Sequence, residues 1–121
     1  MDDKRLKYYN VDTIVENFVK QATSDFNVTR GKHIMWTMGN DFNYQDAEYW
    51  FTNLDKLIAA VNKDGRFNAF YSTVNEYADA KLAEERSGEV SYPTNTHDFF
   101  PYEDHAHAFW TGYFTSRPAL K

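Results

Sequence analysis

The sequence predicts an α/β fold in which helices and strands alternate in the order α-β-α-β-α, followed by an irregular, aromatic-rich segment. Three stretches carry apolar residues at helical spacing, and two shorter stretches between them have strand-like patterns. Strands separated by helices pair in parallel through right-handed crossovers. Because two strands keep open edges and cannot close a barrel, we expect the natural fold to contain more strands than this chain supplies.

The first two predicted helices each have one apolar face. The first, residues 11–24, follows Asn10, which is a favourable capping residue. The second ends at Gly65, because glycine readily adopts the left-handed conformation that terminates helices. Their apolar stripes comprise Val11, Ile14, Val15, Phe18, Val19 and Ala22 in the first helix, and Ala47, Trp50, Phe51, Leu54, Leu57, Ile58 and Val61 in the second.

The third helix is predicted over residues 75–86, since Thr73 and Glu76 have the spacing of a capping box. Residues 33–38 are nearly all apolar, as expected of a strand buried on both faces. Residues 66–72 alternate in polarity like a second strand.

The last third of the chain mixes aromatic residues with acids, histidines, prolines and glycines. Residues 96–118 have neither a clean helical nor a clean strand period. A long irregular stretch of this kind has to pack against something or bind something. The nine Tyr, ten Phe and three Trp of the chain fit either a protein core or the lining of a sugar pocket, and composition does not separate the two.

Composition narrows the function. The net charge is −5 and basic residues form no stripe, so nucleic acid is not an expected partner. The longest apolar run, residues 57–61, is too short to span a membrane. The N-terminus has no apolar region, so we expect no secretory signal in this chain. The absence of cysteine excludes disulfides, zinc fingers and thiol nucleophiles within these residues.

Asp41 is the first candidate for chemistry. It follows Gly39, where the predicted strand 33–38 ends, and it precedes the second helix. Catalytic groups of α/β proteins are commonly placed just past the C-terminal ends of strands. The alternative is an acid that caps the following helix or lies in its first turn. Phosphate-binding loops, nucleophile-elbow serines and zinc-binding HExxH helices are absent from the sequence.

Two other features are ambiguous on spacing alone. Trp110 fits an aromatic core or a platform that stacks on a sugar face. His105-Ala106-His107 has a spacing that some metal sites use, but such a stretch also suits a solvated loop.

Several of these segments, in this order, resemble the α-mannosidases of glycoside hydrolase family 38, most closely the lysosomal or vacuolar type. The resemblance covers residues 9–121. The segments that carry it are Met38-Gly39-Asn40-Asp41-Phe42, Asn53-Leu54-Asp55-Lys56-Leu57, Phe70-Tyr71-Ser72-Thr73, Asp98-Phe99-Phe100-Pro101-Tyr102 and residues 109–118.

The resemblance implies a distorted (β/α)7 barrel with an active-site zinc ion that hydrolyses terminal α-mannosides with retention. Asp41 falls on the position of the acid/base. Trp110 falls on an aromatic that walls the mannose pocket. His105 falls where some members carry an arginine that contacts more distant sugars, so this sequence departs from the family there. The family's nucleophile and zinc ligands lie outside a segment like this one, and His105-Ala106-His107 does not match them.

These implications give the overall expectation. Residues 1–121 form part of a single family 38 N-terminal catalytic domain, incomplete at both ends, and need the remainder of the same polypeptide. The partners are mannose-containing glycans, and the location is a lysosome, a vacuole or the cell exterior. Burial among Trp36, Phe42 and Trp110 would help Asp41 to retain its proton. The alternative is a non-catalytic carbohydrate-binding module or an inactive fragment.

Overall fold

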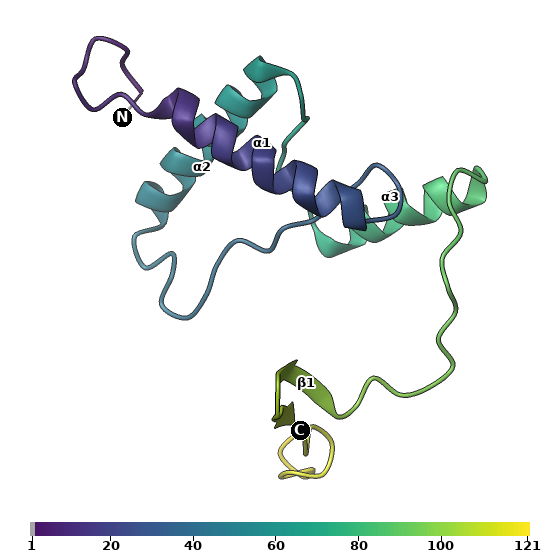
Figure 1. Ribbon diagram of the computed structural model, residues 1–121. Helices are drawn as coiled ribbons and strands as arrows, with labels where there is room; N and C mark the ends of the chain where they lie inside the picture. Colours follow the sequence, from purple (N-terminus) through teal and green to yellow (C-terminus); the bar gives the residue numbers. More distant parts are fainter. Residues whose placement is uncertain (1) are drawn as a thin grey trace.

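The computed structural model describes residues 2–121, which form three helices followed by a small two-stranded sheet (Figure 1). The elements are α1 (Val11–Val28), α2 (Ala47–Asp64), α3 (Val74–Arg86), β1 (Tyr102–His105) and β2 (Ala108–Trp110). The mixed helical and strand content is consistent with an α/β chain. The described residues contain no barrel.

The core lies where α1 crosses α2. Val15 and Val19 on α1 and Val61 on α2 are buried against one another, and Val61 is 0% exposed. The first two are four residues apart, so they project from the same face of the helix. Partly buried side chains surround them, namely Val11, Phe18, Leu57, Ala60, Phe67 and Ala69.

The helix ends confirm two of the predicted signals. Gly65 ends α2 in the left-handed conformation, with φ 85°, and its N–H donates to the Val61 carbonyl at 3.1 Å. Thr73 and Glu76 form a capping box at α3: the Glu76 N–H donates to Thr73 Oγ1 at 3.2 Å and the Thr73 N–H donates to Glu76 Oε2 at 2.7 Å.

Helix α1 starts at Val11 as predicted but runs to Val28 rather than stopping at residue 24. Gln21 Nε2 donates to Asp25 Oδ1 at 2.9 Å, an i to i+4 contact that supports the additional turn. No glycine or proline interrupts the sequence before Gly31, so nothing in the local chain chemistry forces an earlier end.

The two predicted strands are wrong, because residues 33–38 and 66–72 pair with no other strand among residues 2–121. Side chains hold these segments instead. The Asn62 side chain accepts from the Ala69 N–H at 2.7 Å and donates to the Ala69 carbonyl at 2.9 Å, as a neighbouring strand would do. Trp36 Nε1 donates to Asp25 Oδ2 at 2.8 Å, and the Trp36 ring packs edge-on against Phe18 at 4.8 Å.

The C-terminal segment, expected to be irregular, contains the two strands. β1 and β2 are antiparallel, with Tyr102 opposite Trp110, Glu103 opposite Phe109 and His105 opposite Ala108. Strands of four and three residues are too short to show a period in the sequence. His107 closes the hairpin with a positive φ of 63°.

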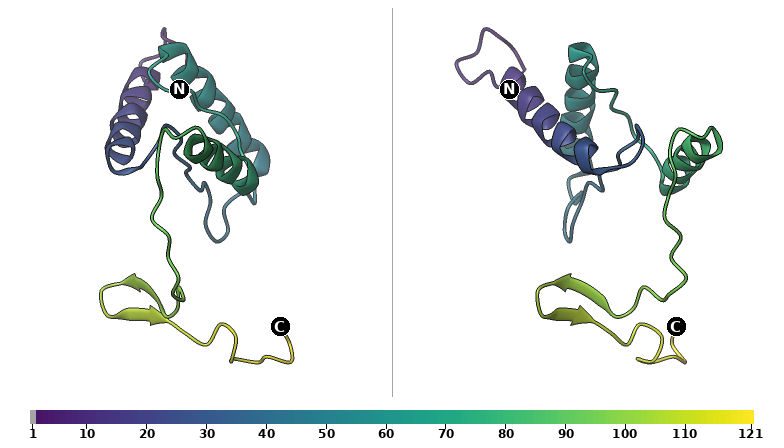
Figure 2. Two further views of the ribbon diagram at one scale, coloured as in Figure 1. Left: turned by 90° about the vertical axis from the view of Figure 1, so that its right-hand side faces the viewer. Right: turned by 45° about the vertical axis from the view of Figure 1, so that its right-hand side comes forward.

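The hairpin lies away from the helices, at the end of a long extended connection from α3 (Figures 1 and 2). Among the described elements, α1 packs on α2 and β1 pairs with β2, and the hairpin packs on no helix. No helix in residues 2–121 combines the length and apolarity needed to cross a membrane.

Candidate active site

Asp41 lies in the turn between residues 33–38 and α2. Gly39 ends the extended segment, and the Asp41 N–H donates to Asn40 Oδ1 at 2.8 Å. The N-cap of α2 is Asp46, whose carboxylate accepts from the Tyr49 N–H at 3.3 Å. The acid of the first turn is Glu48, so Asp41 neither caps α2 nor lies in its first turn, and the helix-cap interpretation of Asp41 is wrong.

Tyr44 fastens this turn. Its hydroxyl donates to the Met38 carbonyl at 2.8 Å, and its ring packs against Trp50 at 5.0 Å and Phe51 at 5.4 Å between centroids. A side-chain carbon at Gly39 would lie 3.1 Å from the Tyr44 ring, so this position has little room for one. Tyr44 was not predicted as a site residue, although it lies only three residues before Ala47, the first residue of α2.

Tyr71 connects residues 66–72 to α2 and contacts the same α2 residue, Phe51, as Tyr44 does. Its ring packs edge-on against Phe51 at 6.1 Å, and its hydroxyl donates to Asp55 Oδ1 at 2.9 Å. Loss of hydration raises the pKa of Tyr71, and the hydrogen bond to Asp55 raises it further. The Tyr71 hydroxyl therefore keeps its proton and stays a donor.

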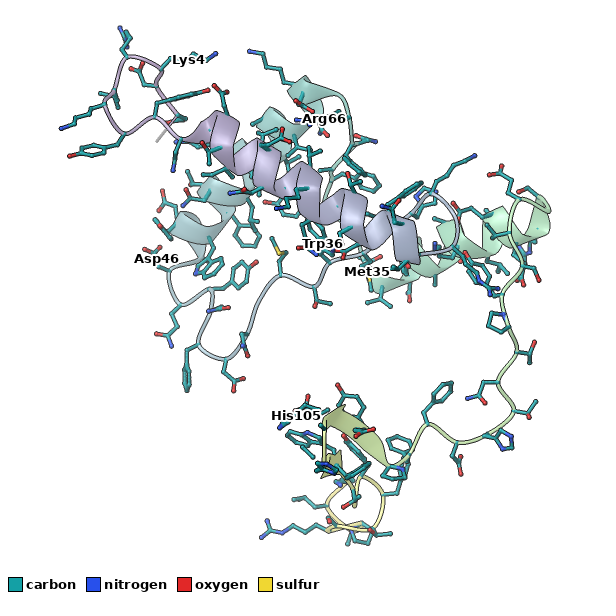
Figure 3. All side chains as sticks on the ribbon, viewed as in Figure 1. Lys4, Met35, Trp36, Asp46, Arg66 and His105 are labelled. Carbon is teal, nitrogen blue, oxygen red and sulfur yellow. The ribbon has the colours of Figure 1, made fainter. Side chains whose placement is uncertain are left out.

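The enclosure expected around Asp41 is not present in residues 2–121. Asp41 is exposed, and the neighbouring Phe42 ring is 84% exposed. Trp36 points back toward α1, where it contacts Phe18 and Asp25 (Figure 3). Trp36 packs on α1, Phe42 stays exposed and Trp110 lies on the hairpin, so none of the three covers the turn.

Trp110 and His105 both lie on the hairpin. Trp110 ends β2 opposite Tyr102 and is 58% exposed. His105 is exposed, and its Nδ1 lies 2.8 Å from Asp104 Oδ2. Beside Trp110, an open and mainly apolar pocket is lined by Phe100, Pro101, Thr111, Gly112, Tyr113, Phe114 and Thr115.

Trp110 and His105 lie on the two strands of one hairpin, and neither lies near Asp41 in the described residues. Figure 3 shows His105 on the hairpin and Asp46, at the start of α2, on the helical part of the molecule. Within the described residues, no three His, Cys, Asp or Glu side chains come together as a metal site would require. The side chains present therefore do not fit a zinc ion.

Comparison with known proteins gives the family. Residues 2–105 match the model described as the glycosyl hydrolases family 38 N-terminal domain. This chain belongs to that family. The match covers Asp41 and His105 and ends before Trp110.

Individual relatives extend the similarity to the whole chain. A probable α-mannosidase of Arabidopsis thaliana is 56% identical over 120 residues, which is 99% of this chain and 11% of the relative. Another α-mannosidase of the same plant is 55% identical over the same share of each chain. The lysosomal α-mannosidase of Cavia porcellus is 44% identical over 100% of this chain and 12% of its own length. The chain thus spans about a ninth of the length of these relatives.

Proposed function

We propose that this chain is part of the catalytic domain of an α-mannosidase that removes terminal α-mannosyl residues from glycans with retention of configuration. The observation that carries the proposal is the 56% identity to a probable α-mannosidase across 99% of the chain, including the turn that presents Asp41. The (β/α)7 barrel belongs to this proposal, with its remaining strands supplied by sequence outside these residues.

Asp41 is the acid/base of the proposed reaction. In the first step, a carboxylate nucleophile attacks the anomeric carbon, the glycosidic C–O bond breaks, and Asp41 gives its proton to the departing oxygen. In the second step, the Asp41 carboxylate takes a proton from the water that attacks the same carbon and displaces the nucleophile. The Asp41 carboxylate is open to a substrate on a turn that Tyr44 fastens. The enclosure expected around an acid/base has to come from the rest of the complete domain.

Trp110 and His105 have separate roles in the proposal. The exposed Trp110 ring walls the mannose pocket by stacking on a sugar face. His105, paired with Asp104, contacts more distant sugars of the glycan where some relatives carry arginine. Both contacts require the hairpin and the Asp41 turn to meet in the complete domain.

The nucleophile and the zinc ligands belong to parts of the family domain outside this chain. A zinc ion held there would supply a Lewis acid and a template for sugar hydroxyl groups. The relatives named lysosomal α-mannosidases suggest a lysosomal location for the whole protein. The family resemblance offers a vacuole or the cell exterior as alternatives.

Replacing Asp41 tests the proposal in the protein expressed from its complete coding sequence. The variant Asp41→Asn should lower kcat/KM on a mannoside with a poor leaving group by about 10³-fold, because proton donation contributes that much to such steps. On an aryl mannoside with a strongly acidic phenol, kcat/KM should change little, since that leaving group needs no proton.

The control is Asp46→Asn. Asparagine keeps the cap at α2, so activity should not change. Wild-type activity in Asp41→Asn on the poor substrate would contradict the proposed role. A complete protein that binds an α-mannoside by calorimetry and never hydrolyses it would instead support the non-catalytic alternative.

A further inference from the structure

Glu84 is the one acidic residue buried within residues 2–121. Its side chain lies on α3 and is only 7% exposed, although α3 is otherwise polar and solvated. A buried carboxylate is costly unless it is paired and hydrogen bonded. The groups that contact the Glu84 carboxylate therefore explain why it is buried.

The partners of Glu84 are at the start of the segment that leads to Asp41. Glu84 Oε1 accepts from the Lys32 backbone N–H at 2.6 Å. Gly31, with φ 79°, passes so close that an added side-chain carbon would lie 2.1 Å from Glu84 Oε2. The close approach and the backbone conformation both require glycine at this position.

Three further groups face the same carboxylate from separate parts of the chain. Lys81 Nζ, one helical turn earlier on α3, lies 3.6 Å from Oε2, and His33 Nε2 lies 3.8 Å from Oε1. The Tyr92 hydroxyl donates to Oε2 at 3.4 Å. Burial raises the pKa of Glu84, but the Lys32 hydrogen bond and the proximity of Lys81 and His33 outweigh burial and hold it below the usual value.

The segment from Lys32 to Gly39, which leads to Asp41, is thus held at three places. Glu84 fixes its start through Lys32, the Trp36 indole fixes its middle through Asp25, and Tyr44 fixes its end through Met38. No strand pairs with this segment in the described residues, so these side-chain contacts replace the usual ladder of backbone hydrogen bonds.

We propose that Glu84 is a positioning residue for the acid/base, holding the backbone that carries Asp41 from the far end of its segment. The inference rests on the proposed function. Glu84 does not itself meet substrate, because it is buried and both of its oxygens are occupied. Its effect on the reaction arises from alignment, and a displacement of about 1 Å at a catalytic group is enough to lower a rate about 10²-fold.

Two substitutions in the protein expressed from its complete coding sequence separate the contacts. Glu84→Gln keeps an oxygen that accepts from the Lys32 N–H but removes the charge facing Lys81 and His33. Glu84→Ala removes both and leaves the Lys32 N–H without its acceptor. The control is Glu85→Gln, a neighbouring residue on α3 that is exposed.

The readout is kcat/KM on the two mannosides used for Asp41, normalised to folded protein by circular dichroism. Glu84→Ala should lower the value on the poor leaving group roughly 10- to 100-fold while changing the activated substrate less than about threefold, because only the former needs a well-placed proton donor. Glu84→Gln should show the same selectivity at a smaller size, and Glu85→Gln should match the wild type.

An equal loss on both substrates, or no loss, would overturn the inference, since a purely structural role does not discriminate between leaving groups. If Glu84→Ala fails to fold, the selectivity of Glu84→Gln decides the matter in the same way. If Asp41→Asn discriminates between the two mannosides and neither Glu84 variant does, only the positioning role of Glu84 is refuted. Absence of selectivity in Asp41→Asn refutes the proposed function itself.

Discussion

The helical part of the chain and the C-terminal hairpin differ in how their candidate functional residues are supported by neighbouring side chains. Asp41 projects from a turn whose backbone is fixed by Tyr44 and whose flanking helices share a core around Val61. Trp110 lies on a hairpin whose aromatic residues remain exposed, at 57% for Phe109 and 58% for Trp110. The difference indicates that contacts within residues 2–121 hold the Asp41 turn, whereas no described helix contacts the hairpin that carries Trp110.

The largest expected effect is a loss of activity caused by a substitution on the hairpin. Trp110→Ala in the complete protein should reduce kcat/KM about 100-fold on either mannoside, because an aromatic anchor contributes about 3 kcal/mol to binding in favourable cases. Hydrogen exchange in α1 and α2 should not change. A loss of protection in the helices would show that the two regions are coupled, contrary to the comparison.

The next effect is structural and confined to the helical part. Val61→Ala removes about two buried methylene equivalents, so it should destabilise the α1–α2 contact by about 2 kcal/mol. Amides in both helices should then exchange about 30-fold faster, as measured by mass spectrometry of the complete protein.

Phe109→Ala is the matched control for Val61→Ala, because it shortens an exposed side chain on the hairpin. It should leave exchange in α1 and α2 unaltered. Equal acceleration by both variants would mean that the Val61 core does not stabilise the helices on its own.

The smallest effect concerns one helix end. Thr73→Ala removes the hydroxyl that accepts from the Glu76 N–H, so the first turn of α3 should lose about 1 kcal/mol. Its amides should exchange roughly fivefold faster, while those of α1 should not respond. Thr73→Ser keeps the hydroxyl and should behave like the wild type; if it matches Thr73→Ala, the cap is not the cause.

The sequence predicted the helices better than the strands for a physical reason. Gly65 and the Thr73–Glu76 pair act through neighbouring residues, so their signals are complete within the local sequence. Residues 33–38 have the composition of a buried strand, but a strand forms only beside a partner. The described chain offers side chains of Asn62 and Asp25 in place of partner strands.

The candidate site was predicted in part. Resemblance selected Asp41, and the structure removed the competing interpretation by placing Asp46 at the helix cap. Tyr44 and Glu84 were missed because their roles arise from contacts with Met38 and Lys32 that no sequence period reveals. The roles of Asp41, His105 and Trp110 in catalysis and binding remain predictions.

The most direct test of Asp41 as the acid/base is the anomeric form of a rescue product. Asp41→Ala in the complete protein is given an activated aryl mannoside and azide, which needs no base to attack the glycosyl-enzyme. We expect azide to restore turnover and to yield the retained α-mannosyl azide, because the nucleophile still occupies the opposite face. Formation of the inverted β-mannosyl azide would make Asp41 the nucleophile, and full activity without azide would remove it from the mechanism.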